Sequence, residues 1–168
     1  TGIIGDIGAG FGIFSEELKK YFSYFSNKPA FVLPVIVDTS RFIANKNDNG
    51  LQTKKYLCYM GNMEITKDDV DNIIKAFAII NKKNPHLELH LYGMPSQKTI
   101  AYLKQLINEL HLNDSILLKG RVESYDVPQI LSNAYILVNS QPDTVRAKGG
   151  FPTKLGEYLA SGVPTLLT

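Results

Sequence analysis

The sequence predicts an α/β fold, in which helices cover both faces of an open, doubly wound parallel sheet of the Rossmann-like kind. From Tyr56 onward, short apolar runs alternate with segments whose apolar residues recur at the helical period. The spacing between runs leaves room for helical crossovers, which join parallel strands with a right-handed connection. A length of 168 residues, with 44% hydrophobic and 20% charged residues, suffices for one compact core.

The predicted strands are short apolar segments rich in Val, Ile, Leu and Tyr. They cover residues 31–37 (FVLPVIV), 56–60 (YLCYM), 87–93 (LELHLYG), 115–120 (SILLKG), 135–140 (YILVNS) and 163–167 (VPTLL). In a doubly wound sheet, ligands bind beyond the carboxyl ends of the strands. We therefore expect the functional residues in the loops that follow Met60, Tyr92, Lys119 and Asn139.

Helices are predicted where a capping residue precedes apolar residues at the helical period. Ser15 caps a helix over 15–25, and Asp126 with Pro128 begins a short one through Leu131. Asp68 or Asp69 begins a helix whose apolar residues are Val70, Ile73, Ile74, Phe77 and Ile80. Ser96 caps a helix whose apolar residues are Ile100, Leu103, Leu106, Ile107 and Leu110. Residues 43–55 are polar and rich in Asn, which predicts a loop.

Residues 31–168 are predicted to form one domain, shortened at its C-terminal end, and residues 1–30 a lead-in with a helix from a preceding region. The chain starts at Thr1 rather than Met and stops at Thr168 directly after a strand-like segment, so we expect a piece of a longer protein. The opening stretch GIIGDIGAGFG lacks the spacing of a dinucleotide fingerprint and the Lys-Ser/Thr of a P-loop. It is interpreted as a flexible or truncated lead-in, with a phosphate cradle as the alternative.

The charges predict no nucleic-acid partner. Lys and Arg total 18, Asp and Glu total 16, and the two signs are interspersed, so no basic surface for nucleic acid or an anionic membrane is expected. The apolar runs are too short to span a bilayer. The single cysteine, Cys58, is expected to be a buried hydrophobe, which fits a reducing compartment. His86, His90 and His111 lie at no metal-ligand spacing, so we expect no metal site.

The loop after Met60 reads GNMEITKDD and carries candidate ligand groups. Gly61 allows a tight turn, and Lys67 directly precedes the predicted helix start. A cation beside the free N–H groups of a helix N-terminus attracts anions. The alternative is that Lys67 is an ordinary solvated charge beside Asp68 and Asp69.

A second candidate is the helix in KGGFPTKLGEYLASGVP, where Pro152 suits the first turn and Gly162 a left-handed C-terminal position. Helical geometry predicts two faces, an apolar one with Leu155, Gly156, Leu159 and Ala160 and an opposite one with Lys154, Glu157 and Ser161. The alternative to a ligand site is that Lys154 and Glu157 form an exposed ion pair.

Five segments follow one another in a characteristic order and spacing, namely YMGNM, TKDDVDNIIKAFAIINKKNPHLELHLYG, LKGRV, ILSNAYILVNS and GFPTKLGEYLASGVPTLL. Together they resemble the nucleotide-sugar-binding C-terminal domain of GT-B-fold retaining glycosyltransferases, the glycosyl transferases group 1 family. The likeness covers residues 31–168, including PVIVDTSRF, which is similar to the linker that precedes this domain. It implies sugar transfer from a nucleoside diphosphate sugar, without metal or other cofactor. The acceptor, a glycan or a lipid-linked molecule, would be held by an N-terminal domain that this chain lacks.

The resemblance further implies a cytoplasmic enzyme of polysaccharide biosynthesis, with peripheral membrane association allowed. Lys67 and Lys154 would be the catalytic residues, because cations stabilise negative charge on the departing diphosphate. Glu157 would accept the ribose hydroxyls. The other donor-binding candidates are Gly61, Asn62, Arg121, Val122, Gly149, Gly150, Phe151, Pro152 and Thr153. We expect the chain to bind nucleotide sugar but to catalyse no transfer without the acceptor domain.

Two positions depart from the family pattern. Asn62 stands where the family commonly has an Arg, so that a diphosphate cation is missing or is supplied by Arg146 or Lys148. Gly149 stands where the family often has a Glu. These departures keep open the alternative of a degenerate, non-catalytic nucleotide-binding or scaffolding module. A nicotinamide-dependent oxidoreductase is disfavoured, because it needs the glycine fingerprint and an acid after its second strand, where this chain has LYGMPSQ.

Overall fold

The structure, a computed structural model, describes residues 3–6, 11–13, 15–33, 36–43, 55–144 and 153–168. Contacts divide the chain into two compact units, one of residues 1–37 with 143–156 and the other of residues 38–142 with 157–168. The boundary predicted between residues 30 and 31 thus lies inside the first unit. The second unit holds six of the predicted site residues, namely Gly61, Asn62, Lys67, Arg121, Val122 and Glu157, whereas Thr153 and Lys154 belong to the first.

The first unit contains a three-stranded sheet in the order β1-β2-β3. Its elements are β1 (Ile3–Asp6), β2 (Phe11–Ile13), α1 (Glu16–Ser23) and β3 (Ala30–Val32). β1 pairs antiparallel with β2, which pairs parallel with β3. In its described part the glycine-rich stretch therefore forms strands rather than a flexible segment. The predicted cap of α1 is confirmed, since the Ser15 hydroxyl accepts a hydrogen bond from the Leu18 N–H at 3.2 Å.

The strand predicted over residues 31–37 is shorter in the structure, because β3 ends at Val32. Leu33, Ile36 and Val37 lie outside any strand, and residues 34–35 lie outside the described part of the chain. Proline has no N–H for a strand ladder, so Pro34 disfavours a longer strand. The strand that exists belongs to the three-stranded sheet and adds nothing to the parallel sheet of the second unit.

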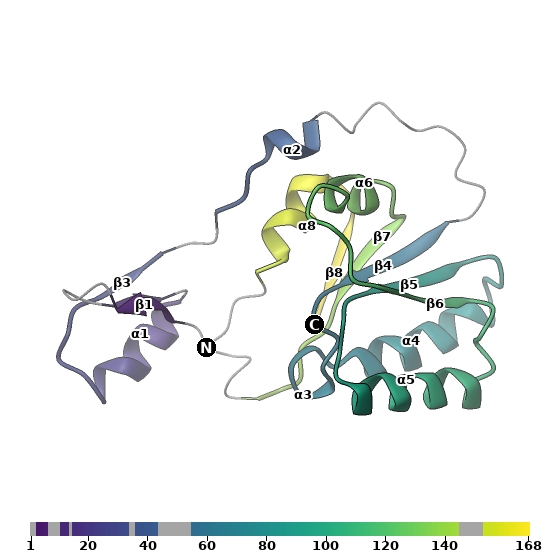
Figure 1. The fold of residues 1–168 in the computed structure, drawn as a ribbon, viewed down its shortest axis with the longest axis horizontal. Helices are drawn as coiled ribbons and strands as arrows, with labels where there is room; N and C mark the ends of the chain where they lie inside the picture. Colours follow the sequence, from purple (N-terminus) through teal and green to yellow (C-terminus); the bar gives the residue numbers. More distant parts are fainter. Residues whose placement is uncertain (1–2, 7–10, 14, 34–35, 44–54, 145–152) are drawn as a thin grey trace. The chain divides into compact units, whose positions relative to one another are not determined.

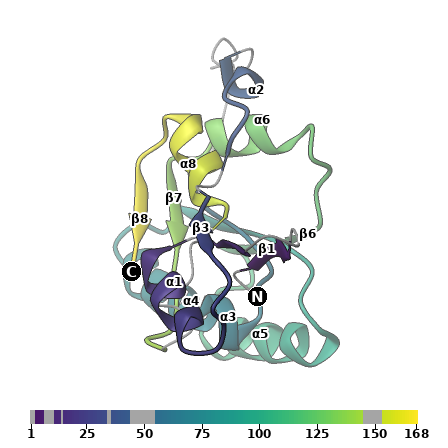
Figure 2. The same ribbon diagram turned by 90° about the vertical axis from the view of Figure 1, so that its left-hand side faces the viewer.

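The second unit is built on a five-stranded parallel sheet in the order β6-β5-β4-β7-β8. Its strands are β4 (Tyr56–Met60), β5 (Glu88–Tyr92), β6 (Ile116–Gly120), β7 (Ile136–Asn139) and β8 (Thr165–Leu167). Its helices are α2 (Ser40–Ile43), α3 (Ile65–Asp68), α4 (Val70–Asn81), α5 (Gln97–Glu109), α6 (Val127–Ser132) and α8 (Leu155–Ser161), of which α8 begins at the end of the first unit. α4 and α5 lie on one face of the sheet, α6 and α8 on the other (Figure 1, Figure 2), which confirms the predicted doubly wound α/β fold.

The chain reverses its direction of travel across the sheet next to β4. It passes from β4 outward to β5 and β6, then crosses back to β7 and β8 on the other side. β4 pairs with β5 along its whole length, from Tyr56 to Met60, but with β7 only at Leu57 and Cys58. The ladder between β4 and β7 thus ends before the carboxyl end of β4. This is the topological switch point, where doubly wound sheets bind ligands.

The core of the second unit lies between the sheet and the helices α4 and α5. It is a continuous cluster of buried side chains, namely Leu57, Tyr59, Met63, Val70, Ile73, Ile74, Phe77, Leu89, Leu91, Leu103, Ile107, Leu112, Ile116 and Val138. All residues of β4 are buried, as is typical of a central strand covered on both faces. Cys58 is among them, as predicted, and burial raises the pKa of its thiol to about 12. Ile80, predicted on the apolar face of α4, is 39% exposed because it lies in the last turn of the helix.

Two of the predicted helix starts differ in detail. Neither Asp68 nor Asp69 caps a helix through its side chain, because α3 precedes α4 and Asp69 joins them in the left-handed conformation, with φ of 49°. Asp126 likewise makes no side-chain cap, although Pro128 lies in the first turn of α6 as predicted. The cap at Ser96 is confirmed, since its hydroxyl accepts a hydrogen bond from the Thr99 N–H at 3.3 Å.

Candidate functional site

Tyr158 fixes α8 to the switch point. Its hydroxyl accepts a hydrogen bond of 2.7 Å from the Met60 N–H and lies 3.3 Å from the Met60 carbonyl oxygen, to which it can donate. Met60 lies beyond the last residue pair between β4 and β7. The Tyr158 hydroxyl therefore provides hydrogen-bond partners for the Met60 N–H and carbonyl that β7 does not provide. The ring is 1% exposed, and this burial raises the pKa of Tyr158. The position of α8 is thereby set against the end of the central strand.

The loops after β4 and β5 approach each other through backbone atoms. The Gly61 N–H donates to the Tyr92 carbonyl at 3.0 Å. A Cβ at Gly61 would overlap the hydroxyl of Tyr59, which itself accepts a hydrogen bond of 3.2 Å from the Met63 N–H. A Cβ at Gly93 would overlap the carbonyl oxygen of Gly61. Both positions therefore require glycine, which lets backbone come close where a side chain cannot.

Glu64 ties the same loop to the start of α5. Its carboxylate accepts a hydrogen bond of 2.6 Å from the Thr99 hydroxyl and another from the Ser96 N–H. These two bonds, the one from Thr99 first, lower the pKa of Glu64. The backbone donor at the start of α5 is thus satisfied by a carboxylate of the protein itself.

A chain of polar side chains crosses the ends of β7 and β8. The Ser140 hydroxyl donates to the Asp69 carboxylate at 3.1 Å and lies 3.1 Å from the Thr168 hydroxyl. The Thr168 hydroxyl also accepts a hydrogen bond of 3.3 Å from the Gln141 N–H. The start of α4 and the ends of these two strands are therefore linked, and the loop after Asn139 is held at the carboxyl edge of the sheet.

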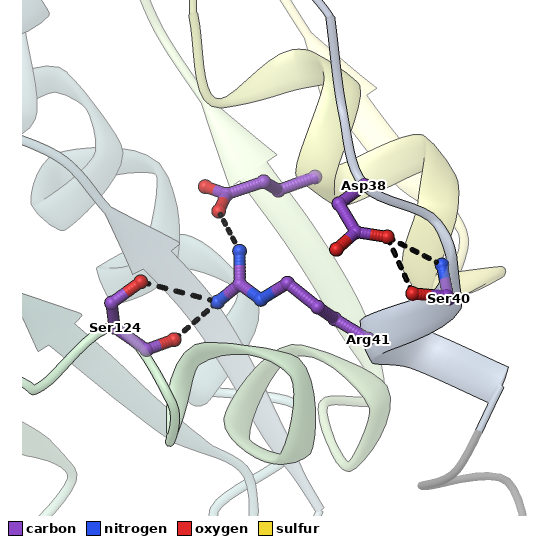
Figure 3. Close-up of polar contacts among 5 residues, drawn as sticks. Asp38, Ser40, Arg41 and Ser124 are labelled. Carbon is purple, nitrogen blue, oxygen red and sulfur yellow. Dashed lines mark hydrogen bonds and ion pairs between the residues drawn. The ribbon is translucent and has the colours of Figure 1, made fainter.

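Arg41 connects three elements of the second unit (Figure 3). One guanidinium nitrogen lies 3.4 Å from a carboxylate oxygen of Glu157 in α8. The other donates to the backbone carbonyl of Ser124 and, at 3.3 Å, to its hydroxyl, in the loop after β6. The Arg41 side chain is 31% exposed and that of Glu157 16% exposed. The carboxylate of Glu157 is thus held next to the loop between β6 and α6.

The sequence model described as Glycosyl transferases group 1 matches residues 41–168, which is most of the chain and nearly all of the second unit. The chain belongs to this glycosyltransferase family. It is 29% identical over 109 residues to mannosylfructose-phosphate synthase of Agrobacterium fabrum, an alignment that covers 61% of this chain and 23% of that enzyme. The chain thus spans under a quarter of the length of this relative.

Solved structures of glycosyltransferases share the fold. The pneumococcal O-GlcNAc transferase GtfA, in complex with UDP and GlcNAc, is 20% identical with a TM-score of 0.72, over 95% of this chain and 30% of that one. Anabaena HepE, in complex with UDP and glucose, is 14% identical with a TM-score of 0.75, over 95% of this chain and 44% of that one. The predicted family and the predicted Rossmann-like fold of GT-B glycosyltransferases are confirmed.

In this group 1 glycosyltransferase chain, several predicted site residues lie at the carboxyl edge of the sheet. Gly61 and Asn62 follow β4, and Arg121 and Val122 follow β6. Glu157 lies in the first turn of α8. The contacts of Tyr158 with Met60, and those of Arg41, connect α8 to both loops. Asn62 and Arg121 are exposed, and Gly61, Val122 and Glu157 are partly buried.

The two catalytic candidates lie in different settings. Lys67 is exposed and lies inside α3, where its N–H donates to the Glu64 carbonyl at 2.9 Å. The expectation that it directly precedes the long helix is therefore corrected, because the extra turn α3 intervenes. Thr153 and Lys154 lie in the turn that leads into α8. The candidates Gly149, Gly150, Phe151 and Pro152, like Arg146 and Lys148, lie outside the described residues.

The faces of α8 differ from the prediction. Its buried residues are Tyr158 and Ser161, while Leu159 is 66% exposed. Helical periodicity alone places Leu155 and Leu159 inward, but the hydroxyl of Tyr158 has backbone partners at Met60 that Leu cannot replace. Ser161, predicted on the polar face, donates to the Tyr158 carbonyl at 2.6 Å. An aromatic hydroxyl near a strand end is the signal that would have indicated this face.

Proposed function

We propose that this chain is the donor-binding C-terminal part of a retaining glycosyltransferase, which transfers a hexose from a nucleoside diphosphate sugar to a glycan or lipid-linked acceptor. The observation that carries the proposal is the position of Glu157 in a group 1 family chain. It is tied through Arg41 to the loop after β6, and its neighbour Tyr158 is bonded to the end of β4. A carboxylate at a switch point is a suitable acceptor for ribose hydroxyls.

The proposed roles follow from charge and position. Glu157 binds the ribose hydroxyls, and Lys67 and Lys154 neutralise charge on the leaving diphosphate, so that no metal ion is needed. Gly61, with Asn62, lets the backbone approach the phosphates. The loop with Arg121 and Val122 contacts the base. Gly149, Gly150, Phe151, Pro152 and Thr153 complete the proposed donor site.

The acceptor would bind to a second domain, and the isolated chain is expected to bind donor without transferring sugar. The proposed setting is the cytoplasm, with peripheral association at a membrane where the acceptor is lipid-linked. Within the described ranges, every helix is too short or too polar to cross a bilayer. Because both GtfA and HepE were determined with UDP, UDP is the first nucleotide to test.

Calorimetric titration with UDP, GDP and ADP, in buffer with EDTA, tests the proposal. We expect selective binding of one nucleotide and loss of that binding in Lys154→Ala and Glu157→Gln. Lys104→Ala, which removes one cation from the exposed surface of α5, is the matched control and should bind normally. If the unchanged chain binds none of the three, the proposal fails in favour of the degenerate module. Binding that persists in both site variants would show that neither side chain contacts the nucleotide.

A further inference from the structure

Arg41 lies in the short helix α2, and the residues before and after Arg41 hold this helix in place. The Asp38 carboxylate accepts hydrogen bonds from the Ser40 hydroxyl and, at 3.0 Å, from the Ser40 N–H. These bonds, the one from the hydroxyl first, lower the pKa of Asp38. On the other side, Phe42 is 1% exposed, and α2 packs against α6. The backbone from which Arg41 projects is therefore held in place in the second unit.

The guanidinium of Arg41 divides its donors between two parts of the candidate site. One nitrogen faces Glu157 in α8, and the other bonds the carbonyl and hydroxyl of Ser124 in the loop after β6. A guanidinium is planar with donors at fixed angles, so these contacts fix the separation of the two groups. Since the pair with Glu157 is 3.4 Å long and partly exposed, its main effect is on position rather than on stability.

We infer that Arg41 is a positioning residue, which holds the Glu157 carboxylate and the loop at Ser124 at the separation that the ribose and base of the donor require. The inference rests on the proposed function, because it concerns the same site. Losing the contact to Arg41 would give the Glu157 side chain more freedom, at a conformational-entropy cost when the nucleotide binds. Arg41 removes this cost before the ligand arrives. Its effect should therefore appear in recognition of the ribose, and not in recognition of the phosphates.

The test compares three ligands by calorimetry: UDP, 2′,3′-dideoxy-UDP, which lacks the ribose hydroxyls, and inorganic pyrophosphate. The unchanged chain should prefer UDP over the dideoxy analogue. In Arg41→Ala we expect this preference to fall roughly 3- to 10-fold, with pyrophosphate affinity unchanged within about twofold. Arg41→Lys keeps the charge but cannot form the fork, so it should show an intermediate preference. Lys104→Ala, which removes a cation from α5, should behave like the unchanged chain.

Several results would overturn the inference. An unaltered UDP preference in Arg41→Ala would show that Arg41 does not position Glu157, while the proposed function would stand. A gain in UDP affinity would show that the guanidinium competes with ribose for the carboxylate. Equal loss for all three ligands would indicate a general effect of charge or folding. If the thermal melt shows that Arg41→Ala does not fold, the Arg41→Lys variant provides the test instead. An Arg41→Lys variant that prefers UDP over the dideoxy analogue as strongly as the unchanged chain would count against the inference. If the unchanged chain binds no UDP, the proposed function fails first.

Discussion

The phenolic oxygen of Tyr158 lies 2.7 Å from the backbone nitrogen of Met60, so a helix side chain satisfies a donor of the central strand. This happens where the ladder between β4 and β7 has already ended. The helix α8 is thus held against the carboxyl end of β4 by one aromatic hydroxyl. Stability and the geometry of the candidate site depend on the same contact.

Tyr158→Phe is expected to lower the free energy of unfolding by about 1–3 kcal/mol, because it leaves the buried Met60 N–H without a partner while the ring still fits. Urea denaturation followed by circular dichroism measures the change. Tyr125→Phe, at an exposed position before α6, is the matched control and should have no effect. An equal stability of the two variants would show that water or a backbone shift replaces the hydroxyl.

Glu64 should make the stability depend on pH in the acid range. Its folded-state pKa is lowered by hydrogen bonds from Thr99 and Ser96, so its contribution is fully present above its unfolded value. That contribution is lost as the pH falls through the folded pKa. We expect Glu64→Gln to be less stable than the unchanged chain near neutral pH and to lose less stability on acidification. Urea midpoints measured between neutral and acid pH test this, with the exposed Glu123→Gln as control; parallel curves for both variants would contradict it.

Gly93 and Gly120 offer a comparison between steric overlap and backbone strain. Both have positive φ, but a Cβ at Gly93 would overlap the Gly61 carbonyl oxygen, whereas one at Gly120 meets nothing within 4 Å. Gly120→Ala should therefore cost about 1 kcal/mol from strain alone. Gly93→Ala should cost roughly 3 kcal/mol, since overlap adds to strain, and should displace the loop after β4. Thermal unfolding ranks the two, and an equal loss would show that the Gly61 carbonyl moves freely.

Lys67→Ala should weaken nucleotide binding and reduce its dependence on salt. Removing one cation near a diphosphate is expected to lower the affinity roughly 3- to 10-fold, and salt screening should shrink the difference. Titrations at low and high ionic strength provide the measurement, with Lys82→Ala, which removes an exposed cation after α4, for comparison. Identical affinities at low salt would favour the interpretation of Lys67 as an ordinary surface charge.

The strands and helices could be predicted because apolar periodicity and helix caps depend on residues that are close together in the sequence. Tyr56–Met60 reads as a continuous apolar strand, and Ser15 and Ser96 read as caps, all of which the structure confirms. The short turn α3 was missed because it has too few residues for a periodic pattern. The strands β1 and β2 were missed because glycine has low strand propensity, and pairing with distant residues decides their conformation.

For the candidate site, the sequence located the loops but not the contacts between them. Motif order indicates Gly61 and Glu157, whereas no sequence pattern indicates Arg41. The partners of Arg41, Ser124 and Glu157, are far from it along the chain, and no local pattern links them. No local pattern indicates Tyr158 either, because its hydroxyl bonds the backbone of Met60, which is far from it along the chain.

The burial of Cys58 has a practical consequence for measuring motion in this chain. It is the chain's one cysteine, it is fully buried, and burial raises its pKa to about 12. Alkylating reagents attack the thiolate, so the native thiol should stay unmodified under folding conditions. A cysteine introduced at an exposed position, such as Glu123→Cys in the loop that Arg41 contacts, would then be the single site of labelling. A fluorophore placed there could report on changes around this loop when nucleotide is added.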